Sequence, residues 1–175
     1  RVRQVWANTK GQRVCGRGYA TPFIKPFQED AERVIAAMPA TQGVLRWPHN
    51  GTGKVMLCDE GEIPLPDVSV DRIILAHALE CSEQVRPMLR EIWRILADDG
   101  RLIVVVPNRR GIWARFDSTP FGRGNPYTLW QLNGLLRDTF FVPSRTERAL
   151  FMPPSQSGAV EASACLLYTS PSPRD

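Results

Sequence analysis

Three short stretches of the sequence contain residue types that could do chemistry. The first, RVCGRGYATP at residues 13–22, places Gly16 and Gly18 where a short apolar run would turn into a helix, and glycines at such a turn let the backbone approach a ligand closely. The second is the acidic pair Asp59 and Glu60, which directly follows the apolar run VMLC. The third is His77, which follows the run IILA and is a candidate general base because histidine exchanges a proton near neutral pH. The alternative for His77 is a structural hydrogen bond to the backbone beside a pocket.

The elements that must position these residues follow from the hydrophobic pattern. Apolar runs alternate with helical patterns, which predicts an α/β domain with a doubly wound, mostly parallel, Rossmann-like sheet. Strands are expected at residues 12–18, 33–38, 54–60, 70–80, 101–108 and 144–154, and helices at residues 21–33, 82–97 and 127–140. Pro26 predicts a short or irregular first helix, and Gly100 is the expected left-handed cap of the second. Residues that follow successive parallel strands face the same edge of the sheet, so the three stretches should lie near one another.

Composition and charge are those of an ordinary globular domain. The chain has 175 residues, of which 43% are hydrophobic and 23% charged, and no apolar run approaches the ~20 residues that span a membrane. The net charge of +4, partly gathered in NRRGIWARF at residues 108–116, is too small to favour nucleic acid as a partner. The four cysteines have no metal-ligand spacing, and His49 and His77 are the only histidines, so no metal site is expected. Such cysteines indicate reduced thiols and hence a cytoplasmic protein.

A longer pattern, from Lys54 to Asn108, resembles the middle of the class I S-adenosylmethionine-dependent methyltransferases of the type 11 family. This family has an acid after its third strand, a Leu-Pro-x-Pro-Asp-x-Ser-x-Asp segment before the fourth, then a Leu-Glu-His-like turn, a Leu-Arg-Glu-x-x-Arg-x-Leu helix and a glycine before the fifth. The matching residues, in chain order, are Asp59, Pro64, Pro66, Asp67, Ser69, Asp71, Leu79, Glu80, Leu89, Arg90, Glu91, Arg94, Leu96 and Gly100. The resemblance implies the class I methyltransferase fold, an enzyme, and S-adenosylmethionine as the cofactor.

The resemblance also implies roles for single residues. Asp59 would accept a hydrogen bond from the adenine amino group, with the amide of Glu60 near the ring; the alternative is that Asp59 caps a turn. His77 would line the methionine side of the cofactor and the acceptor pocket. Asp67 and Asp71 would shape the turn before the fourth strand and the entry into it.

The first glycine motif of the family, approximately Val-Leu-Asp-x-Gly-x-Gly-x-Gly, is only partly kept. Aligned by the preceding strand, Gly16 stands where the family has its acid, and Gly18 matches the first of the three glycines. Ala20 and Pro22 stand at the other two. The acid that ends the family's second strand and holds the ribose hydroxyls corresponds to Met38. The expected cofactor-binding residues are Gly16, Gly18, Tyr19, Met38, Asp59, Glu60 and His77.

Two functions stay open at this point. One is a methyltransferase that acts on a small-molecule acceptor, with His77 as its candidate catalytic residue. The other is a methyltransferase-like domain that has lost efficient cofactor binding and serves as a binding or scaffold module. The arginine-rich and aromatic segment at residues 108–128 could cover an aromatic or anionic acceptor, or it could pack onto the sheet edge. Its candidate acceptor contacts are Arg109, Arg110, Trp113 and Tyr127.

The two ends of the sequence do not fit a complete domain. The chain begins at Arg1 without a methionine, so we expect a fragment. The last eleven residues, CLLYTSPSPRD at 165–175, fit no secondary-structure period and resemble the translation of a sequencing adapter; the alternative is a disordered tail. We therefore expect one domain at residues 1–164, an artefactual tail at 165–175, and a C-terminally truncated sheet without its last antiparallel strand.

Overall fold

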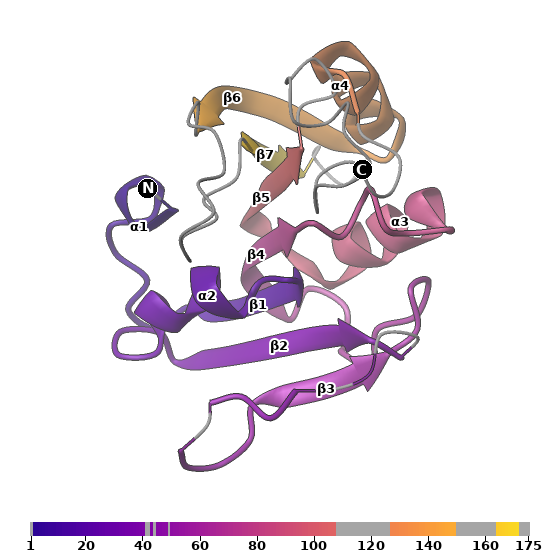
Figure 1. Cartoon of the computed structure of the whole chain (residues 1–175). Coiled ribbons are helices and arrows are strands. Elements are labelled where there is room, and N and C mark those ends of the chain that lie inside the picture. The colour runs from indigo at the N-terminus through magenta and orange to yellow at the C-terminus, as the bar shows by residue number, and fades with distance from the viewer. Residues whose placement is uncertain are drawn as a thin grey trace, which may run out of the picture.

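A seven-stranded sheet forms the centre of the computed structural model, which describes residues 2–40, 43, 45–48, 50–107, 127–149 and 164–171 (Figure 1). The strands are β1 (Arg13–Gly18), β2 (Arg33–Pro39), β3 (Val55–Cys58), β4 (Val70–Ala76), β5 (Leu96–Pro107), β6 (Phe141–Ala149) and β7 (Ala164–Pro171). Their order is β3-β2-β1-β4-β5-β7-β6. Strands β1 to β5 are parallel, and β7 runs antiparallel to both β5 and β6. The expected doubly wound, mostly parallel sheet is confirmed.

Helices cover both faces of this sheet. On one face pack α1 (Val2–Val5), α2 (Thr21–Ile24) and the 3-10 turn η1 (Lys25–Phe27); on the other pack α3 (Val85–Ile95) and α4 (Leu129–Asp138). The helix after β1 is short and continues as the 3-10 turn that contains Pro26. The irregular first helix is therefore confirmed, because proline has no amide to donate to a helical hydrogen bond.

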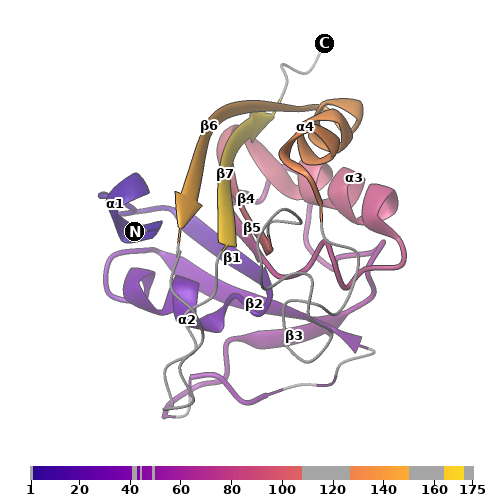
Figure 2. The same ribbon diagram turned by 45° about the horizontal axis from the view of Figure 1, so that its top comes forward.

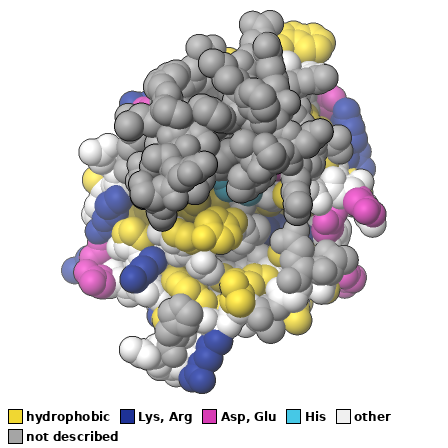
Figure 3. Space-filling model, in the orientation of Figure 1, with side chains coloured by type: hydrophobic (Ala, Val, Ile, Leu, Met, Phe, Trp, Pro, Cys, Tyr) yellow, Lys and Arg dark blue, Asp and Glu magenta, His cyan; other side chains and the backbone are white. Residues whose placement is uncertain are grey.

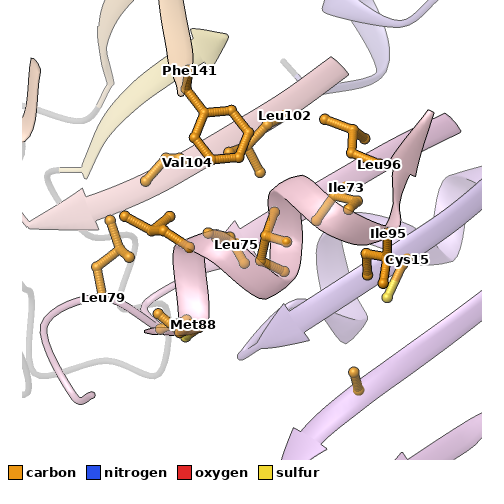
Figure 4. Packing of buried hydrophobic residues seen from close by; sticks show 14 of the residues in the cluster. Cys15, Ile73, Leu75, Leu79, Met88, Ile95, Leu96, Leu102, Val104 and Phe141 are labelled. Atoms are coloured by element: carbon orange, nitrogen blue, oxygen red, sulfur yellow. The ribbon is translucent and has the colours of Figure 1, made fainter. Parts of the chain in front are cut away.

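Alternating apolar residues along the central strands form two cores. On the face of α2 the strands contribute Val14, Val34, Ile74 and Ile103, and on the face of α3 they contribute Cys15, Ile73, Leu75, Leu102 and Val104 (Figure 4). Successive strand residues point to opposite faces, so a sheet covered on both sides needs apolar residues at nearly every position. Each fully buried leucine or isoleucine contributes roughly 1.5–3 kcal/mol, and these layers therefore hold the strand ends in fixed positions.

The start of β5 differs from the helix cap expected there. Helix α3 ends at Ile95, and Leu96 already pairs with Val70 of β4. Gly100 does not have the left-handed backbone of the predicted cap, so that prediction is wrong. A Cβ at Gly100 would lie 2.5 Å from Cγ of Leu96 and 2.6 Å from the carbonyl oxygen of Ala97. Glycine is needed there because the backbone folds tightly against the preceding residues.

Residues 164–171 lie in the sheet, contrary to the expectation that the chain end contributes no strand. Strand β7 lies between β5 and β6, with Leu167 opposite Val104 on one side and Thr146 on the other (Figure 2). Without it the backbone groups of β5 on that side would be unpaired, and the run CLLYT has the composition of a strand. The expectation of a missing last strand is therefore wrong. The division of the chain at residue 164 stays a prediction, because a strand position does not report the origin of its residues.

Two arginine–carboxylate clusters fix the segments that lead into the sheet. Arg13 at the start of β1 donates from its amide and its guanidinium to Asp71 of β4, at 2.7–3.0 Å. Arg94 of α3 donates to Glu91, to Asp67 and to two carbonyls of the loop before β4. Both aspartates therefore have the structural roles that the resemblance implied.

Asp71→Asn is expected to destabilise the protein by about 1–2 kcal/mol at neutral pH, because Arg13 loses a charged acceptor in a partly exposed pair. The hydrogen bonds from Arg13 hold the pKa of Asp71 below its ordinary value. The stabilisation is therefore present above that ordinary value and is lost as the pH falls through the lower pKa of the folded state. Urea unfolding at neutral pH and below about pH 4 measures it, and the difference between wild type and variant should shrink in acid.

Asp99→Asn is the matched control for this experiment. Asp99 is exposed, and its carboxylate has no hydrogen bond to any described residue. Its replacement should change the free energy of unfolding by less than about 0.5 kcal/mol at every pH. A difference between Asp71→Asn and wild type that is equally large in acid would contradict the assigned charge interaction.

Candidate functional site

The carboxyl ends of four parallel strands meet at one edge of the sheet. Strand β1 ends at Gly18, β2 at Pro39, β3 at Cys58 and β4 at Ala76. From β1 the chain continues to β2 and β3 on one side and then returns to β4 and β5 on the other, so the strand order reverses between β1 and β4. In open α/β sheets, ligands bind outside the carboxyl ends of the strands at this switch point. The residues directly after these strands are therefore the candidates for a ligand site.

The turn after β1 brings two backbones into contact at the switch point. Gly18 has a φ of 73°, and the amide of Tyr19 donates to the carbonyl of Ala76 at 2.8 Å. A Cβ at Gly18 would overlap that carbonyl oxygen and would lie 3.0 Å from Cβ of Ala78. The left-handed backbone and the lack of space both require glycine here.

A cavity of about 500 Å³ opens beside the ends of β2 and β3 and the start of α3. Four carboxylates line it, those of Asp59, Glu60, Glu62 and Glu83. A narrower cleft adjoins the cavity, shares Glu60 and Cys81 with it, and is lined by Gly18 and His77 at the switch point. The cavity has the size of a small-molecule pocket, and its acidic wall suits a ligand rich in hydrogen-bond donors or positive charge.

The side chain of Glu60 is held by the segment that begins α3. One of its oxygens accepts from the hydroxyl of Ser82 at 2.6 Å and from the amides of Glu83 and Gln84 at 3.1 Å each. Burial raises the pKa of Glu60, but these hydrogen bonds outweigh that effect, so the pKa lies below its ordinary value. Glu60 is therefore ionised at neutral pH and ties the loop after β3 to the start of α3.

Arg17 is a residue of the site that sequence reasoning missed. It is fully buried in β1, next to Gly18, and it lines the narrow cleft. Its guanidinium donates to the Sγ of Cys58 at 3.3 Å and to the carbonyl of Asp59 at 2.9 Å, whereas its Nε has no hydrogen bond to any described residue. Its charge also lowers the pKa of Glu60. The signal in the sequence was a charged residue at an inward position of a strand that is otherwise apolar.

His77 lies where the sequence placed it, in the turn after β4. Its Nδ1 is 2.7 Å from Oε1 of Glu80, which is buried. The sequence analysis matched Glu80 to the family without recognising it as the partner of this histidine. The signal available in the sequence was the spacing of three residues between His77 and Glu80, which lets their side chains meet.

Three other predicted cofactor contacts lie apart from the two cavities. Gly16 is inside β1, where a Cβ would be 2.7 Å from Cβ of Ala20, so it permits the packing of α2. Met38 is buried in the core on that same face. Tyr19 is 66% exposed beside the edge. Their roles as cofactor contacts stay predictions.

Of the predicted acceptor contacts, only Tyr127 belongs to the described residues. It packs against the core on the face of α3 and α4, and burial raises its pKa, with a smaller contribution from the charge of Glu80. Arg109, Arg110 and Trp113 lie outside the described residues. No group of three or more histidine, cysteine, aspartate or glutamate side chains within the described ranges is arranged to hold a metal ion.

Solved structures with the same fold include several S-adenosylmethionine-dependent methyltransferases. One, from Thermotoga maritima and described as a possible histamine N-methyltransferase, has a TM-score of 0.68 at 19% identity, covering 97% of this chain and 87% of its own. Another, 1,6-didemethyltoxoflavin N1-methyltransferase of Burkholderia thailandensis with bound S-adenosylhomocysteine, has a TM-score of 0.68 at 17% identity, covering 98% of this chain and 75% of its own. The class I methyltransferase fold is therefore confirmed.

Residues 14–104 match the methyltransferase domain family, and the chain belongs to this family. Two probable S-adenosylmethionine-dependent methyltransferases of Mycobacterium tuberculosis, from strains CDC 1551 and H37Rv, are 33% identical to the chain over 137 residues. The alignment covers 73% of this chain and 46% of each relative, so the chain spans about half the length of these curated relatives. The family resemblance carried by residues 54–108 is confirmed.

Gly18→Ala is expected to destabilise the protein by about 1–3 kcal/mol or more, because alanine is strained at this φ and its Cβ would push the Ala76 carbonyl away. Gly134→Ala is the matched control. Gly134 lies in α4 with nothing within 4 Å of an added Cβ, so alanine there should stabilise by about 0.5–1 kcal/mol through helix propensity. Chemical unfolding of the two variants measures both effects, and equal stability of the two would contradict the close approach at the switch point.

Proposed function

We propose that the chain catalyses the transfer of a methyl group from S-adenosylmethionine to a small-molecule acceptor. The observation that carries this proposal is the acidic cavity of about 500 Å³ at the carboxyl edge of a methyltransferase-family sheet. Protein interiors are close-packed, so an open cavity at this edge favours an enzyme over the scaffold module that the sequence left open.

The residues around the cavity fit the cofactor chemically. S-adenosylmethionine presents hydrogen-bond donors in its adenine amino group, its ribose hydroxyls and its ammonium group, and it carries a positive sulfonium, whereas its carboxylate and adenine ring nitrogens accept hydrogen bonds. Carboxylates accept such hydrogen bonds and balance positive charge. We assign Asp59 to the adenine amino group, because its carboxylate is exposed at the cavity wall while that of Glu60 is bound to the start of α3. The amide of Glu60 stays our candidate for a contact with the ring.

The altered glycine motif keeps the residue that the turn needs. Gly18 supplies the left-handed turn, and we propose that the backbone of Gly18 and Tyr19 lies along the cofactor. Gly16 and Met38 remain proposed contacts on the strength of the family alignment. The acid missing at Met38 removes charge-assisted hydrogen bonds worth about 1.5–3 kcal/mol each, and Glu62 supplies further negative charge in the same cavity.

The chain contributes position and charge to the reaction. When bound, the cofactor supplies a methyl group on a sulfonium, which is already a strong electrophile. Holding an acceptor in line with such a group can provide most of the rate enhancement. We propose that the turn after β4 lines this position and that His77, which lines the narrow cleft, takes up a proton from the acceptor.

The acceptor side of the proposed site includes Tyr127 from the described residues, together with Arg109, Arg110 and Trp113. A small molecule is the acceptor class we propose. Among the coloured side chains on the face shown in Figure 3, Lys and Arg lie at several separate places. The small net charge of +4 supports a small molecule over nucleic acid, which needs a continuous basic surface.

The location of the protein in the cell is a further part of the proposal. No helix among the described residues is long and apolar enough to cross a membrane. Cys15, Cys58 and Cys81 are free thiols. We propose a cytoplasmic location on this basis, because free thiols persist in a reducing compartment.

Asp59→Ala is expected to weaken the binding of S-adenosylhomocysteine by about 10- to 100-fold, because the adenine amino group loses a charged acceptor. Isothermal titration of the chain measures the dissociation constant. Glu83→Ala is the matched control, because it removes the same charge from the same cavity at a different position. An equal loss in both variants would mean that Asp59 acts only through its charge and does not hold the adenine.

Arg17→Met is expected to change the preference between the two forms of the cofactor. S-adenosylmethionine carries one positive charge more than S-adenosylhomocysteine, and the buried guanidinium beside the cleft repels it. Removing that charge should lower the dissociation constant of the methionine form relative to the homocysteine form by roughly three- to tenfold, the effect of a charge pair at about 10 Å with intermediate screening. Any distortion of the Asp59 turn affects both ligands, so the ratio isolates the charge. The same ratio in Arg17→Met, in the surface control Arg90→Met and in wild type would refute the electrostatic role.

A further inference from the structure

A buried carboxylate with an unsatisfied oxygen lies behind His77. The side chain of Glu80 is 3% exposed, and its Oε1 lies 2.7 Å from Nδ1 of His77. Its second oxygen, Oε2, is buried without a hydrogen bond to any described residue. A buried charge that is only partly satisfied is costly, so this pair is poor evidence of a contribution to stability. The buried carboxylate of Glu80 is therefore better explained by a role in function than by a role in stability.

The backbone conformation of His77 is a second observation that supports a functional role for this pair. Its φ of 53° is uncommon for a residue other than glycine, although histidine adopts it more often than most residues, and the conformation is held by a hydrogen bond from its amide to the carbonyl of Val105 at 2.9 Å. His77 lines the narrow cleft together with Gly18, at the switch point where the strand order reverses. The turn after β4 and a buried carboxylate thus hold one imidazole at the ligand edge.

We propose that Glu80 is a positioning residue that holds His77 as the general base of the methyl transfer, and that the acceptor is a protic group, a hydroxyl, a phenol or an N–H. This inference rests on the proposed function and deepens it by naming the acceptor class.

The chemistry follows from what a carboxylate can do. An ionised carboxylate only accepts hydrogen bonds, so Nδ1 of His77 carries the hydrogen and the lone pair of the neutral ring lies on Nε2. Nε2 takes the proton that the acceptor loses, while a lone pair of the acceptor forms the bond to the methyl carbon and the pair of the sulfur–methyl bond returns to sulfur. Glu80 stabilises the imidazolium until its proton passes to water. A tertiary amine or a thioether, which loses no proton, would have no use for this pair.

The neighbouring titratable groups do not compete for this role. Burial, helped by the charge of Glu80, raises the pKa of Tyr127, and burial, helped by the charges of Glu80 and Glu60, raises that of Cys81. Both side chains therefore keep their protons at neutral pH. Glu60 also lines the cleft, but its carboxylate is held by the hydroxyl of Ser82 and the amides of Glu83 and Gln84, so we assign the proton transfer to the imidazole of His77.

The test begins with the ring of His77 itself. Since the chain has only two histidines, His49→Gln leaves a single imidazole for ¹⁵N nuclear magnetic resonance. In this background we expect a protonated Nδ1 and an unprotonated Nε2 at neutral pH, and Glu80→Leu should move the hydrogen to Nε2 in most molecules. An unprotonated Nδ1 in the background protein, or an unchanged tautomer in Glu80→Leu, would overturn the proposal. Glu80→Leu should fold because it removes a buried charge, and the isosteric Glu80→Gln serves as the second variant, with an expected mixture of tautomers.

The second part separates this inference from the proposed function. Titration with S-adenosylhomocysteine should give the same dissociation constant, within about twofold, for wild type and Glu80→Leu; absence of binding to folded wild type would be a failure of the proposed function, not of the pair. Formation of S-adenosylhomocysteine is then followed with a panel of alcohols, phenols and primary amines, and with tertiary amines and thioethers as the aprotic set. We expect turnover in the protic set only, with kcat lower by on the order of 10- to 100-fold in Glu80→Leu and KM unchanged. A wild-type protein that binds the cofactor product but methylates only aprotic members, or none, overturns the acceptor class, and an unchanged kcat in Glu80→Leu overturns the role of Glu80.

Discussion

The close approach of β1 and β4 at their carboxyl ends is the constraint on which the site depends. Gly18 pairs with Ala76, and the next amide, that of Tyr19, donates to the carbonyl of Ala76. The turn after β1 and the turn after β4 therefore share one bond. A shift at either end would move His77 relative to the glycine turn, so the geometry of both walls of the narrow cleft is set by a contact that only glycine allows.

Charges of opposite sign lie close together at this edge of the sheet. The buried guanidinium of Arg17 opposes a cationic ligand, and its hydrogen bonds to Cys58 and to the Asp59 carbonyl do not neutralise it. The carboxylates that line the cavity provide the opposite charge, and that of Glu60 is kept ionised by its hydrogen bonds and by Arg17. Under the proposed function, the acidity of the cavity has two tasks, to balance the charge of Arg17 inside the protein and to attract a cationic cofactor from solution.

The sequence predicted the parts of the fold that local pattern determines. The five parallel strands follow from apolar runs of the right length, and the edge positions of Asp59 and His77 follow from where those runs end. The tight backbone at Gly100 was taken for a helix cap because glycine serves both situations, and only the packing of Leu96 distinguishes them. The last strand was missed because its assignment depends on a vacant place in the sheet beside β5, which is a property of the whole fold.

The difference between what local pattern determines and what the whole fold determines also explains why the sequence pattern identifies the family but not the acceptor. Many residues of the matched segment connect elements of the fold. Asp71 fixes β1 to β4, and Glu91 and Arg94 fix the loop before β4 to α3. These contacts place an edge where a cofactor can bind, and any acceptor would need that edge equally. The groups that we propose for contact with the acceptor, Tyr127 and the imidazole of His77, are not among these matched contacts, and the family pattern does not report what they bind. The chemistry of these groups must therefore be worked out from individual contacts, such as the one between His77 and Glu80, rather than from the pattern that gives the fold.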